Sequence, residues 1–321
     1  MIRADGPNES LDRVLGLSTH NMEKYLSPTN MDLNDEEIFE SIELNDFQSV
    51  KRLLQSKVSA NVTDRDCFTP LIYACSYGDI DIAKLLVKYK ADPAYAADDG
   101  SSPLICALAQ GYLDVATFLL SRPGVCVNYE DNKLQPLYLP VQEGKYDAIK
   151  FLLKRKADPN LSSKDNVVLL IAAQEKNVKI VELLIKYGAD PNKGNIKNGI
   201  TPLFVAIQNW STPIIRALLR AKSDVDHKNS NGLSPIQLAM NIESVEILEL
   251  LIQHTSYIDK VYDSSPDTTP LLFAIDVDSP DMINIVLKCK ADVNKANSQG
   301  TTPLLMAAEF GDVETVRNVY F

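Results

Sequence analysis

The hydrophobic residues of this chain recur in pairs of short stretches with helical spacing, and a polar turn follows each pair. In residues 64–96, the segment Leu71 to Tyr77 predicts a first helix, and the segment from about Ile80 to Tyr89 predicts a second. A Thr-Pro step precedes the first helix. Threonine can cap a helix, and proline fits the first helical position because its missing N–H has no partner there. The pattern therefore predicts a helix–turn–helix unit.

This unit returns with a nearly fixed period. Successive prolines that open the expected first helices are 33, 33, 66, 33, 35 and 33 residues apart, and the double interval hides a degenerate copy with Val168 in place of proline. These prolines are Pro70, Pro103, Pro136, Pro202, Pro235, Pro270 and Pro303. A second marker, seen as Ala91-Asp92-Pro93 and Ala189-Asp190-Pro191-Asn192, keeps the same interval. A period of this length indicates stacked supersecondary units rather than a closed globule.

Stacking is required because each helix is short. Isolated helices under roughly 12–15 residues are marginal in water. Each pair must therefore bury its apolar faces against the neighbouring pair, which produces a nearly one-dimensional array with one continuous core.

At this point the sequence closely resembles the ankyrin-repeat family. The resemblance rests on Thr69-Pro70-Leu71, Thr201-Pro202-Leu203 and Thr302-Pro303-Leu304, on glycines that close the first helices, such as Gly78 and Gly111, and on Leu-Leu pairs in the second helices. It covers about residues 34–321. It implies an all-α solenoid of helix–turn–helix pairs linked by β-hairpin-like loops, with a concave groove. One departure is systematic: the position after Thr-Pro-Leu, usually histidine in the family, is mostly apolar here, which predicts apolar packing between repeats.

The period divides the chain into a leader, a cap and repeats. Residues 1–33 form a polar leader, and 34–63 an N-terminal capping pair with a charged outer face. Seven repeats follow, and 297–321 is a final incomplete or capping copy. The repeats are expected at 64–96, 97–129, 130–161, 162–195, 196–228, 229–263 and 264–296. In copy 130–161, Pro140 falls within the expected first helix, where an interior proline costs about 3 kcal/mol.

Composition narrows the classes of partner and the compartment. The net charge of −11 argues against nucleic acid and anionic membranes, which require basic patches, and favours a protein partner with a basic surface. Simple solubility is the other explanation for this charge. The five cysteines lack CxxC spacing, and no apolar run reaches membrane-spanning length. We therefore expect reduced thiols, no membrane insertion and a monomeric array in the cytoplasm, or alternatively the nucleus.

Catalytic chemistry finds little support in the sequence. The nucleotide-binding, zinc-protease and serine-hydrolase motifs are missing, and the three histidines, His20, His227 and His254, are scattered. We expect no enzyme activity, no cofactor, no metal and no catalytic residue. A pair of acids such as Asp276 and Asp278 is better explained as solvated surface.

Candidate partner-binding residues follow from the resemblance, because relatives contact partners through hairpin tips and the ends of the first helices. These positions hold Arg65, Asp66, Phe68, Tyr77, Asp98, Asp99, Gln110, Glu143, Glu175, Asn209, Trp210, Asp276, Asp278, Glu309 and Phe310. Trp210, the only tryptophan, replaces the helix-breaking glycine and is either a binding hot spot or packing over its own repeat. Asn294, in an Asp-Val-Asn context, resembles asparagines that hydroxylases modify in some arrays; a structural hairpin role is the alternative.

These features predict a non-catalytic scaffold or adaptor that binds a protein through its concave face and hairpin tips. Two alternatives stay open at this level: an N-terminal recognition arm of a larger enzyme, channel or signalling protein that continues beyond residue 321, and an enzyme in its own right. Fold alone does not decide between them.

Overall fold

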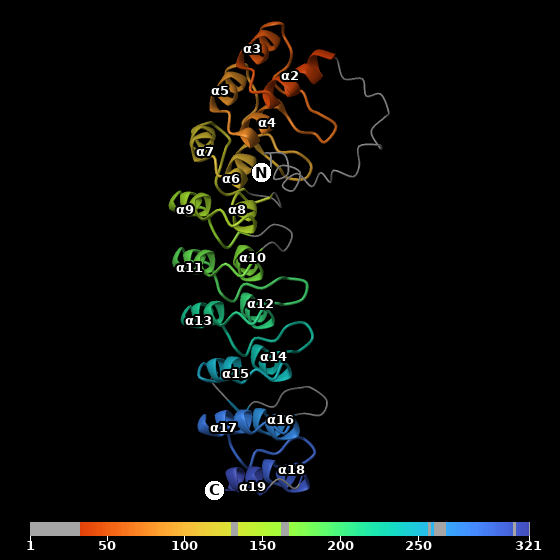
Figure 1. Ribbon diagram of the computed structural model, residues 1–321, viewed down its shortest axis with the longest axis vertical. Coiled ribbons are helices and arrows are strands. Elements are labelled where there is room, and N and C mark those ends of the chain that lie inside the picture. Colours follow the sequence, from red (N-terminus) through yellow and green to blue (C-terminus); the bar gives the residue numbers. More distant parts are fainter. Residues whose placement is uncertain are drawn as a thin grey trace, which may run out of the picture. The chain divides into compact units, whose positions relative to one another are not determined.

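The computed structural model describes residues 33–129, 134–161, 167–255, 258–259, 268–310 and 313–320. These residues form helices joined by turns, with no extended strand among them, which confirms the predicted all-α fold (Figure 1). The helices are α2 (Leu33–Glu43), α3 (Phe47–Gln55), α4 (Pro70–Tyr77), α5 (Ile80–Lys88), α6 (Pro103–Gln110), α7 (Leu113–Leu120), α8 (Tyr138–Gln142), α9 (Tyr146–Lys154), α10 (Val168–Gln174), α11 (Val178–Lys186), α12 (Pro202–Gln208), α13 (Thr212–Arg220), α14 (Pro235–Asn241), α15 (Val245–Ile252), α16 (Pro270–Asp276), α17 (Pro280–Lys288), α18 (Pro303–Phe310) and α19 (Val313–Tyr320). The predicted leader, apart from Leu33, lies outside the described residues.

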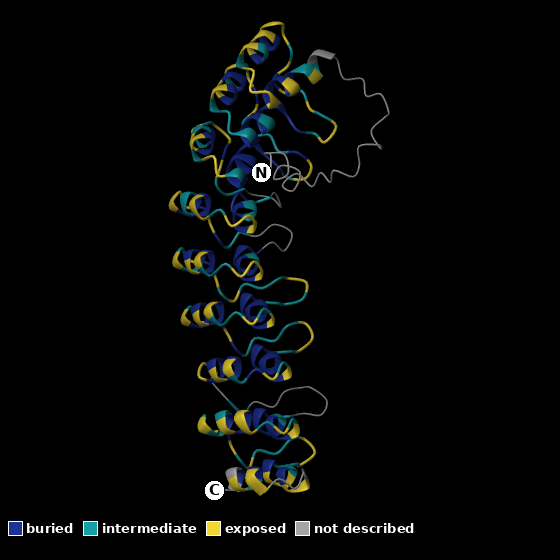
Figure 2. Ribbon diagram, in the orientation of Figure 1, coloured by how far each residue is buried: buried dark blue, intermediate teal, exposed yellow. Residues whose placement is uncertain are grey.

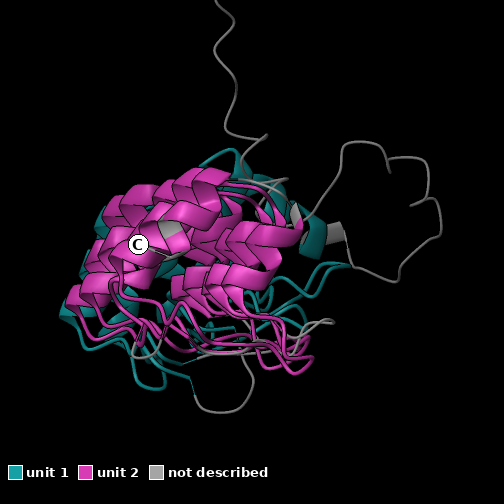
Figure 3. Ribbon diagram, turned by 90° about the horizontal axis from the view of Figure 1, so that it is seen from below, with its two compact units in different colours: residues 1–163 teal, residues 164–321 magenta. Residues whose placement is uncertain are grey.

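The chain forms two compact units, residues 1–163 and 164–321 (Figure 3). In the first unit, α2, α4, α6 and α8 stack as a layer of first helices, and α3, α5 and α7 stack beside them as second helices. In the second unit, α10, α12, α14, α16 and α18 form the first-helix layer, and α11, α13, α15, α17 and α19 form the second. Each unit is therefore a two-layer stack in which a helix packs on its sequence partner and on the equivalent helix of the next pair.

The first helices begin at the signal that the sequence predicts. Thr69 caps α4 by accepting a hydrogen bond from the backbone N–H of Ile72 at 3.4 Å, and Pro70 takes the first helical position. Ser102 and Thr269 cap α6 and α16 in the same way. Glycine ends the helix where the backbone turns left-handed, as at Gly78 with φ 81°. A side chain is strained in that conformation, and glycine is not.

The core lies along the first-helix layer of each unit. In several of these helices the second and third residues are at most 1% exposed, as are Leu71 and Ile72 in α4 and Leu203 and Phe204 in α12. Figure 2 shows buried positions on the sides where helices face each other and exposed ones on the outer faces and loops. The position usually held by histidine in the family is thus filled mainly by buried apolar side chains, as expected. Gln237 is an exception, because it forms a capping box with Ser234 at the start of α14.

Pro140 is accommodated by a shorter helix. α8 begins at Tyr138, two residues after the Pro136 that was expected to open it. Pro140 therefore occupies the first turn of α8. The N–H groups of the first turn have no intrahelical acceptor, so the missing N–H costs no helix hydrogen bond.

A recurrent asparagine ties each of several hairpins to the next repeat. Asn61 donates from Nδ2 to the Lys90 carbonyl at 2.9 Å and accepts from the Asp92 N–H at 2.8 Å. Asn128 makes the same pair of bonds to repeat 130–161, and Asn192 to repeat 196–228. The lysine that offers its carbonyl has a positive φ each time, 70° at Lys90. We call these contacts the asparagine clips; they fix neighbouring repeats by backbone hydrogen bonds as well as by apolar burial.

Among the described residues of the second unit, two buried hydroxyls, those of Thr201 and Ser223, have no hydrogen-bond partner. Ser223 is 7% exposed and its Oγ is unpaired, while the same position in other repeats is alanine, as at Ala91, Ala157 and Ala189. Burying an unpaired polar group costs about 1–3 kcal/mol.

We therefore predict that Ser223→Ala raises the free energy of unfolding by about 1 kcal/mol. Urea unfolding followed by circular dichroism measures the change. The matched control, Ala189→Ser, should lower stability by a similar amount because it creates the same unpaired hydroxyl. A lower midpoint for Ser223→Ala would contradict the assignment.

Candidate functional site

The predicted hairpin residues of the first unit lie on two adjacent loops. The first loop closes through the Asp64 N–H and the Phe68 carbonyl at 3.0 Å, and the second through the Ala97 N–H and the Ser101 carbonyl at 2.8 Å. The Tyr95 hydroxyl bridges the loops by donating to the Cys67 carbonyl at 2.8 Å. The structure thus brings together four exposed residues, which we call the hairpin set: Arg65, Asp66, Asp98 and Asp99.

Phe68 does not join this exposed set. It is 3% exposed and packs in a core cluster with Ile72, Ala97 and Cys106. Asp64 explains the inward turn, since its Oδ1 accepts the N–H groups of both Asp66 and Phe68 and folds the loop back on itself. The prediction that Phe68 contacts a partner is therefore wrong for this structure, in which Phe68 is a core residue.

Two tyrosines that sequence reasoning missed lie beside the hairpin set. Tyr73 donates to Asp64 Oδ2 at 2.7 Å and packs edge-on against Phe39, with ring centroids 5.1 Å apart. Burial and the bonded Asp64 carboxylate raise the pKa of the Tyr73 hydroxyl well above its usual value. Tyr73 and Tyr95 are both half-buried, so they give this face a rigid aromatic floor. Their signal in the sequence was weak, because the Tyr73 position holds cysteine in the next repeat, at Cys106, and tyrosine recurs at the Tyr95 position in one other repeat, at Tyr129.

The other predicted residues stand at the ends of first helices and in the turns that follow. Tyr77, Gln110 and Asn209 are half-buried. The remaining described members are exposed: Glu143, Glu175, Trp210, Asp276, Asp278 and Glu309. Phe310 ends α18, and its side chain lies outside the described residues. Because α4 has eight residues, about 12 Å separates the hairpin set from Tyr77 at the other end of that helix.

Trp210 combines a left-handed backbone with an exposed aromatic side chain. Its φ is 55°, in the left-handed region, and its side chain is 58% exposed. The equivalent residues Gly78 and Gly111 show that this turn requires a left-handed residue. Asn209, beside it, donates to the Ala173 carbonyl at 3.4 Å and so holds the end of α12 against α10. The exposed indole is thus attached to a turn that this hydrogen bond holds in place.

Asn294 occupies the position that forms clips elsewhere. Its backbone N–H donates to Asp292 Oδ1 at 2.9 Å, and its side chain is exposed. Asn61, Asn128 and Asn192 use their amides to join repeats. The amide at this position has a structural role in those three residues, and for Asn294 itself both the hairpin role and hydroxylation stay predictions.

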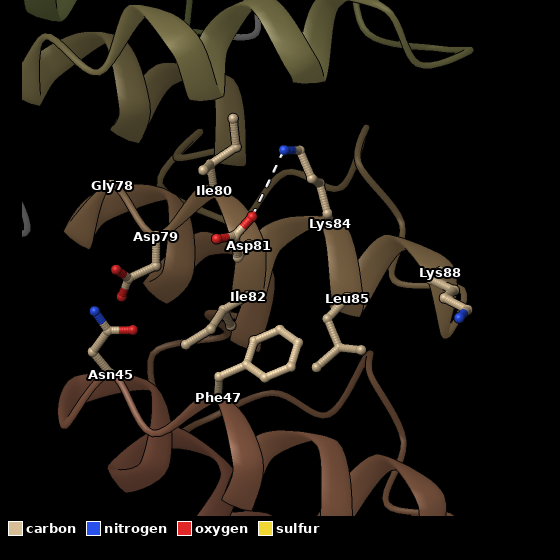
Figure 4. Close-up of a pocket in the computed structure, with 10 residues that line it drawn as sticks. All are labelled: Asn45, Phe47, Gly78, Asp79, Ile80, Asp81, Ile82, Lys84, Leu85 and Lys88. Atoms are coloured by element: carbon tan, nitrogen blue, oxygen red, sulfur yellow. Dashed lines mark ion pairs between the residues drawn. The ribbon is translucent and has the colours of Figure 1, made fainter.

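A groove of about 600 Å³ lies between the second helices α3 and α5 of the first unit (Figure 4). Phe47, Ile82 and Leu85 give it an apolar floor, while Asp81 pairs with Lys84 at 3.7 Å on its rim. The Asn45 and Asp79 side chains point toward each other at one end. The sequence had not indicated this groove.

Two aspartates at equivalent positions, each just before a second helix, have carboxyl pKa values that are shifted in opposite directions. Asp46 precedes α3 and accepts the N–H groups of Gln48 and Ser49, and hydrogen bonding from Ser49 lowers the pKa of its carboxyl. Asp79 precedes α5 without any side-chain cap bond, and partial burial raises the pKa of its carboxyl. The contrast arises because hydrogen bonds favour the charged form and desolvation disfavours it.

Comparison with known proteins identifies the family. The family model for ankyrin repeats (3 copies) matches residues 38–131 and 169–263, together more than half of the chain. The chain belongs to the ankyrin-repeat family. Ankyrin repeats generally mediate protein–protein interactions, and the family is typically non-catalytic.

Individual relatives agree with this assignment over part of their length. The chain is 39% identical over 99 residues to the putative ankyrin repeat protein FPV031 of Fowlpox virus, covering 29% of each chain. It is 27% identical to Protein glp-1 of Caenorhabditis elegans, covering 51% of this chain and 14% of that protein. It thus spans less than a third of either relative. The crystal structure of the human ASB11 ankyrin repeat domain matches with a TM-score of 0.58 at 22% identity, covering 68% of this chain and 97% of that domain, a likeness of fold alone.

The described residues contain neither a candidate metal site nor a candidate membrane span. No group of three or more histidine, cysteine, aspartate or glutamate side chains there could hold a metal ion. In the same part of the chain, no helix is both long and apolar enough to cross a membrane.

The two helix-start aspartates predict a difference in titration. As the pH falls, Asp79 should bind its proton before Asp46. The contribution of Asp79 to stability is present below the usual aspartate pKa and is lost as pH rises through its raised value. That of Asp46 is present at higher pH and is lost as pH falls through its lowered value. Carboxyl ¹³C chemical shifts measure both; a higher pKa at Asp46 would contradict the prediction.

The strained Trp210 predicts a stabilising substitution. Trp210→Gly should raise the free energy of unfolding by about 1 kcal/mol, because a left-handed backbone costs non-glycine residues about 1–2 kcal/mol. Trp210→Ala keeps that strain and should give no such gain. If the indole instead packs over its own repeat, both variants will be less stable than the wild type in thermal unfolding.

Proposed function

We propose that this protein is a non-catalytic scaffold or adaptor that binds a protein partner through the face made by its first helices and hairpins. The carrying observation is Trp210, which combines a left-handed backbone with an indole that is 58% exposed. The fold requires the left-handed turn, but it does not require tryptophan there, since glycine takes this position at Gly78 and Gly111. Tryptophan is enriched at binding hot spots because it buries a large area with few rotatable bonds.

The acidic hairpin set supports a second contact region in the first unit. Asp66 and Asp98 are exposed on adjacent loops, and Tyr73 and Tyr95 lie beside them in fixed positions. A basic partner segment fits this chemistry, and the bridging bonds leave little to be ordered on binding. The net charge of −11 would speed the approach of such a partner.

The stack also supports the alternative, a recognition arm of a larger protein. Leu304 and Leu305 of α18 are 38% and 57% exposed, whereas the equivalent Leu271 and Leu272 are at most 1% exposed. One further helix pair against α18 would bury both. Reading the coding sequence beyond residue 321 separates the two proposals.

The first experiment is capture of partners from cell lysate with wild type and a Trp210→Gly, Tyr77→Ala double variant. We expect the variant to lose specific partners about tenfold or more, since hot-spot residues contribute 2 kcal/mol or more. Tyr187→Ala, an aromatic change at the end of second helix α11, is the matched control and should retain them. Partners kept equally by all three proteins would overturn the proposal that this face carries the contact.

A further inference from the structure

Two neighbouring repeats of the first unit carry the same aromatic–arginine pair on their second helices. Just beyond α9, the Arg155 guanidinium lies 3.6 Å from the centre of the Phe151 ring, and just beyond α7, the Arg122 guanidinium lies 4.9 Å from the centre of the Phe118 ring. Each arginine follows its phenylalanine by four residues, which is the spacing of facing side chains on a helix. We call these two arginines, together with the phenylalanine ring beneath each, the arginine pair.

Neither guanidinium is neutralised within the described residues. No ion pair joins Arg122 or Arg155 to a described carboxylate; Arg122 donates only to the neighbouring Ser121 hydroxyl, at 2.9 and 3.2 Å. Acidic residues on α7 and α9, Asp114 and Asp147, lie in the first turns, at the opposite ends of these helices. The arginines therefore keep most of their N–H donors for a ligand.

The charge around the arginine pair is positive, unlike the chain as a whole. Lys150 lies 5.8 Å from the Tyr146 ring centre, and Lys154 and Lys156 flank Arg155 in sequence. Cations at a helix C-terminus compensate the helix dipole, which accounts for charge there. The dipole does not account for a phenylalanine under each arginine. Two other second helices combine leucine at that position, Leu85 and Leu183, with tyrosine in place of arginine, at Tyr89 and Tyr187, and α13 and α17 have Ala217 and Ile285 there.

Stacking on a ring prepares an arginine for recognition. The planar guanidinium can bind a carboxylate through two parallel N–H bonds, and the ring beneath it limits the rotamers that binding would otherwise freeze. Second helix α9 follows α7 in the same layer (Figure 1). α7 packs on α6 and α9 packs on α8, and α6 and α8 pack on each other. Packed helices are about 8–10 Å apart. An extended chain advances about 10 Å in three residues, so carboxylates three positions apart match this spacing.

We propose that the arginine pair is a second binding surface, which takes an extended acidic segment of a protein partner with carboxylates at i and i+3. The surface lies on the second-helix layer, away from the hairpin set, and its charge is opposite to that of the hairpin set. Its small extent favours a peptide over a nucleic acid or a membrane, because the net charge of −11 repels large polyanions.

Fluorescence anisotropy with two labelled peptides of identical composition tests this surface. One peptide has glutamate at every third position, and the other has its glutamates together. We expect the spaced peptide to bind more tightly. Arg122→Gln, Arg155→Gln should weaken it about tenfold, as expected for the loss of two partly exposed ion pairs. Phe118→Leu, Phe151→Leu, which installs the residue found at Leu85, should weaken it less while leaving both charges.

The matched control is Arg216→Gln, Arg220→Gln in α13, which removes the same charge from exposed arginines of the second unit. It should bind the spaced peptide like the wild type, and circular dichroism checks that all variants fold. Equal weakening by both arginine variants would reduce the effect to net charge and overturn the proposal. The proposal also fails if vesicles containing phosphatidylserine, or a second copy of the protein, bind through Arg122 and Arg155 while the spaced peptide does not.

Discussion

The burial of one short helix pair by the next is the interaction on which the rest of this structure depends. A helix of eight residues such as α4 cannot hold itself together, and its apolar residues lose contact with water only because α2 and α6 pack on either side. Burying an aliphatic side chain contributes about 1.5–3 kcal/mol. Leu71 and Ile72 are almost wholly buried in this way. Stability is thus shared between neighbours, and outward-facing positions are free to vary.

The asparagine clips add directional hydrogen bonds to this apolar packing. Apolar packing allows small slides and rotations between pairs, whereas two hydrogen bonds from one amide, as at Asn61, fix where the next repeat sits. The amide donates to the carbonyl of a lysine in a left-handed turn, such as Lys90, and accepts from the N–H of the residue two positions later, such as Asp92. Where asparagine is replaced, the linkage changes: Asp226 accepts from the Thr255 hydroxyl, and Asp259 from the Asp292 N–H. The clips therefore fix the orientation of neighbouring repeats, which apolar burial alone does not determine.

The period, the helix starts and the core were predictable because they depend on local chemistry and on repetition. The Thr-Pro signal places a cap and a first turn together, and the buried Leu71 and Ile72 follow it directly. Features that depend on a partner about 30 residues away were not predictable, and they include the clips and the Tyr95 bridge to Cys67. Phe68 was placed at an exposed tip because hairpin tips are usually exposed; the bonds to Asp64 that turn it inward required the folded loop. For Trp210 the sequence left display and packing open, and the folded turn leaves its side chain 58% exposed.

The hairpins and the second-helix ends of the first unit carry charges of opposite sign, for different structural reasons. Acids gather on the hairpins, where Asp64 and Asp99 accept hydrogen bonds within their own turns. Asp98 accepts one from the Cys67 thiol of the neighbouring loop at 3.9 Å, and Asp66 is exposed. Cations gather at the ends of the second helices, where the helix dipole favours them. Local structure explains much of the charge on both faces, so charge alone is weak evidence of binding. The evidence lies in what local structure does not require: an indole on a strained turn at Trp210, and a ring beneath each of Arg122 and Arg155.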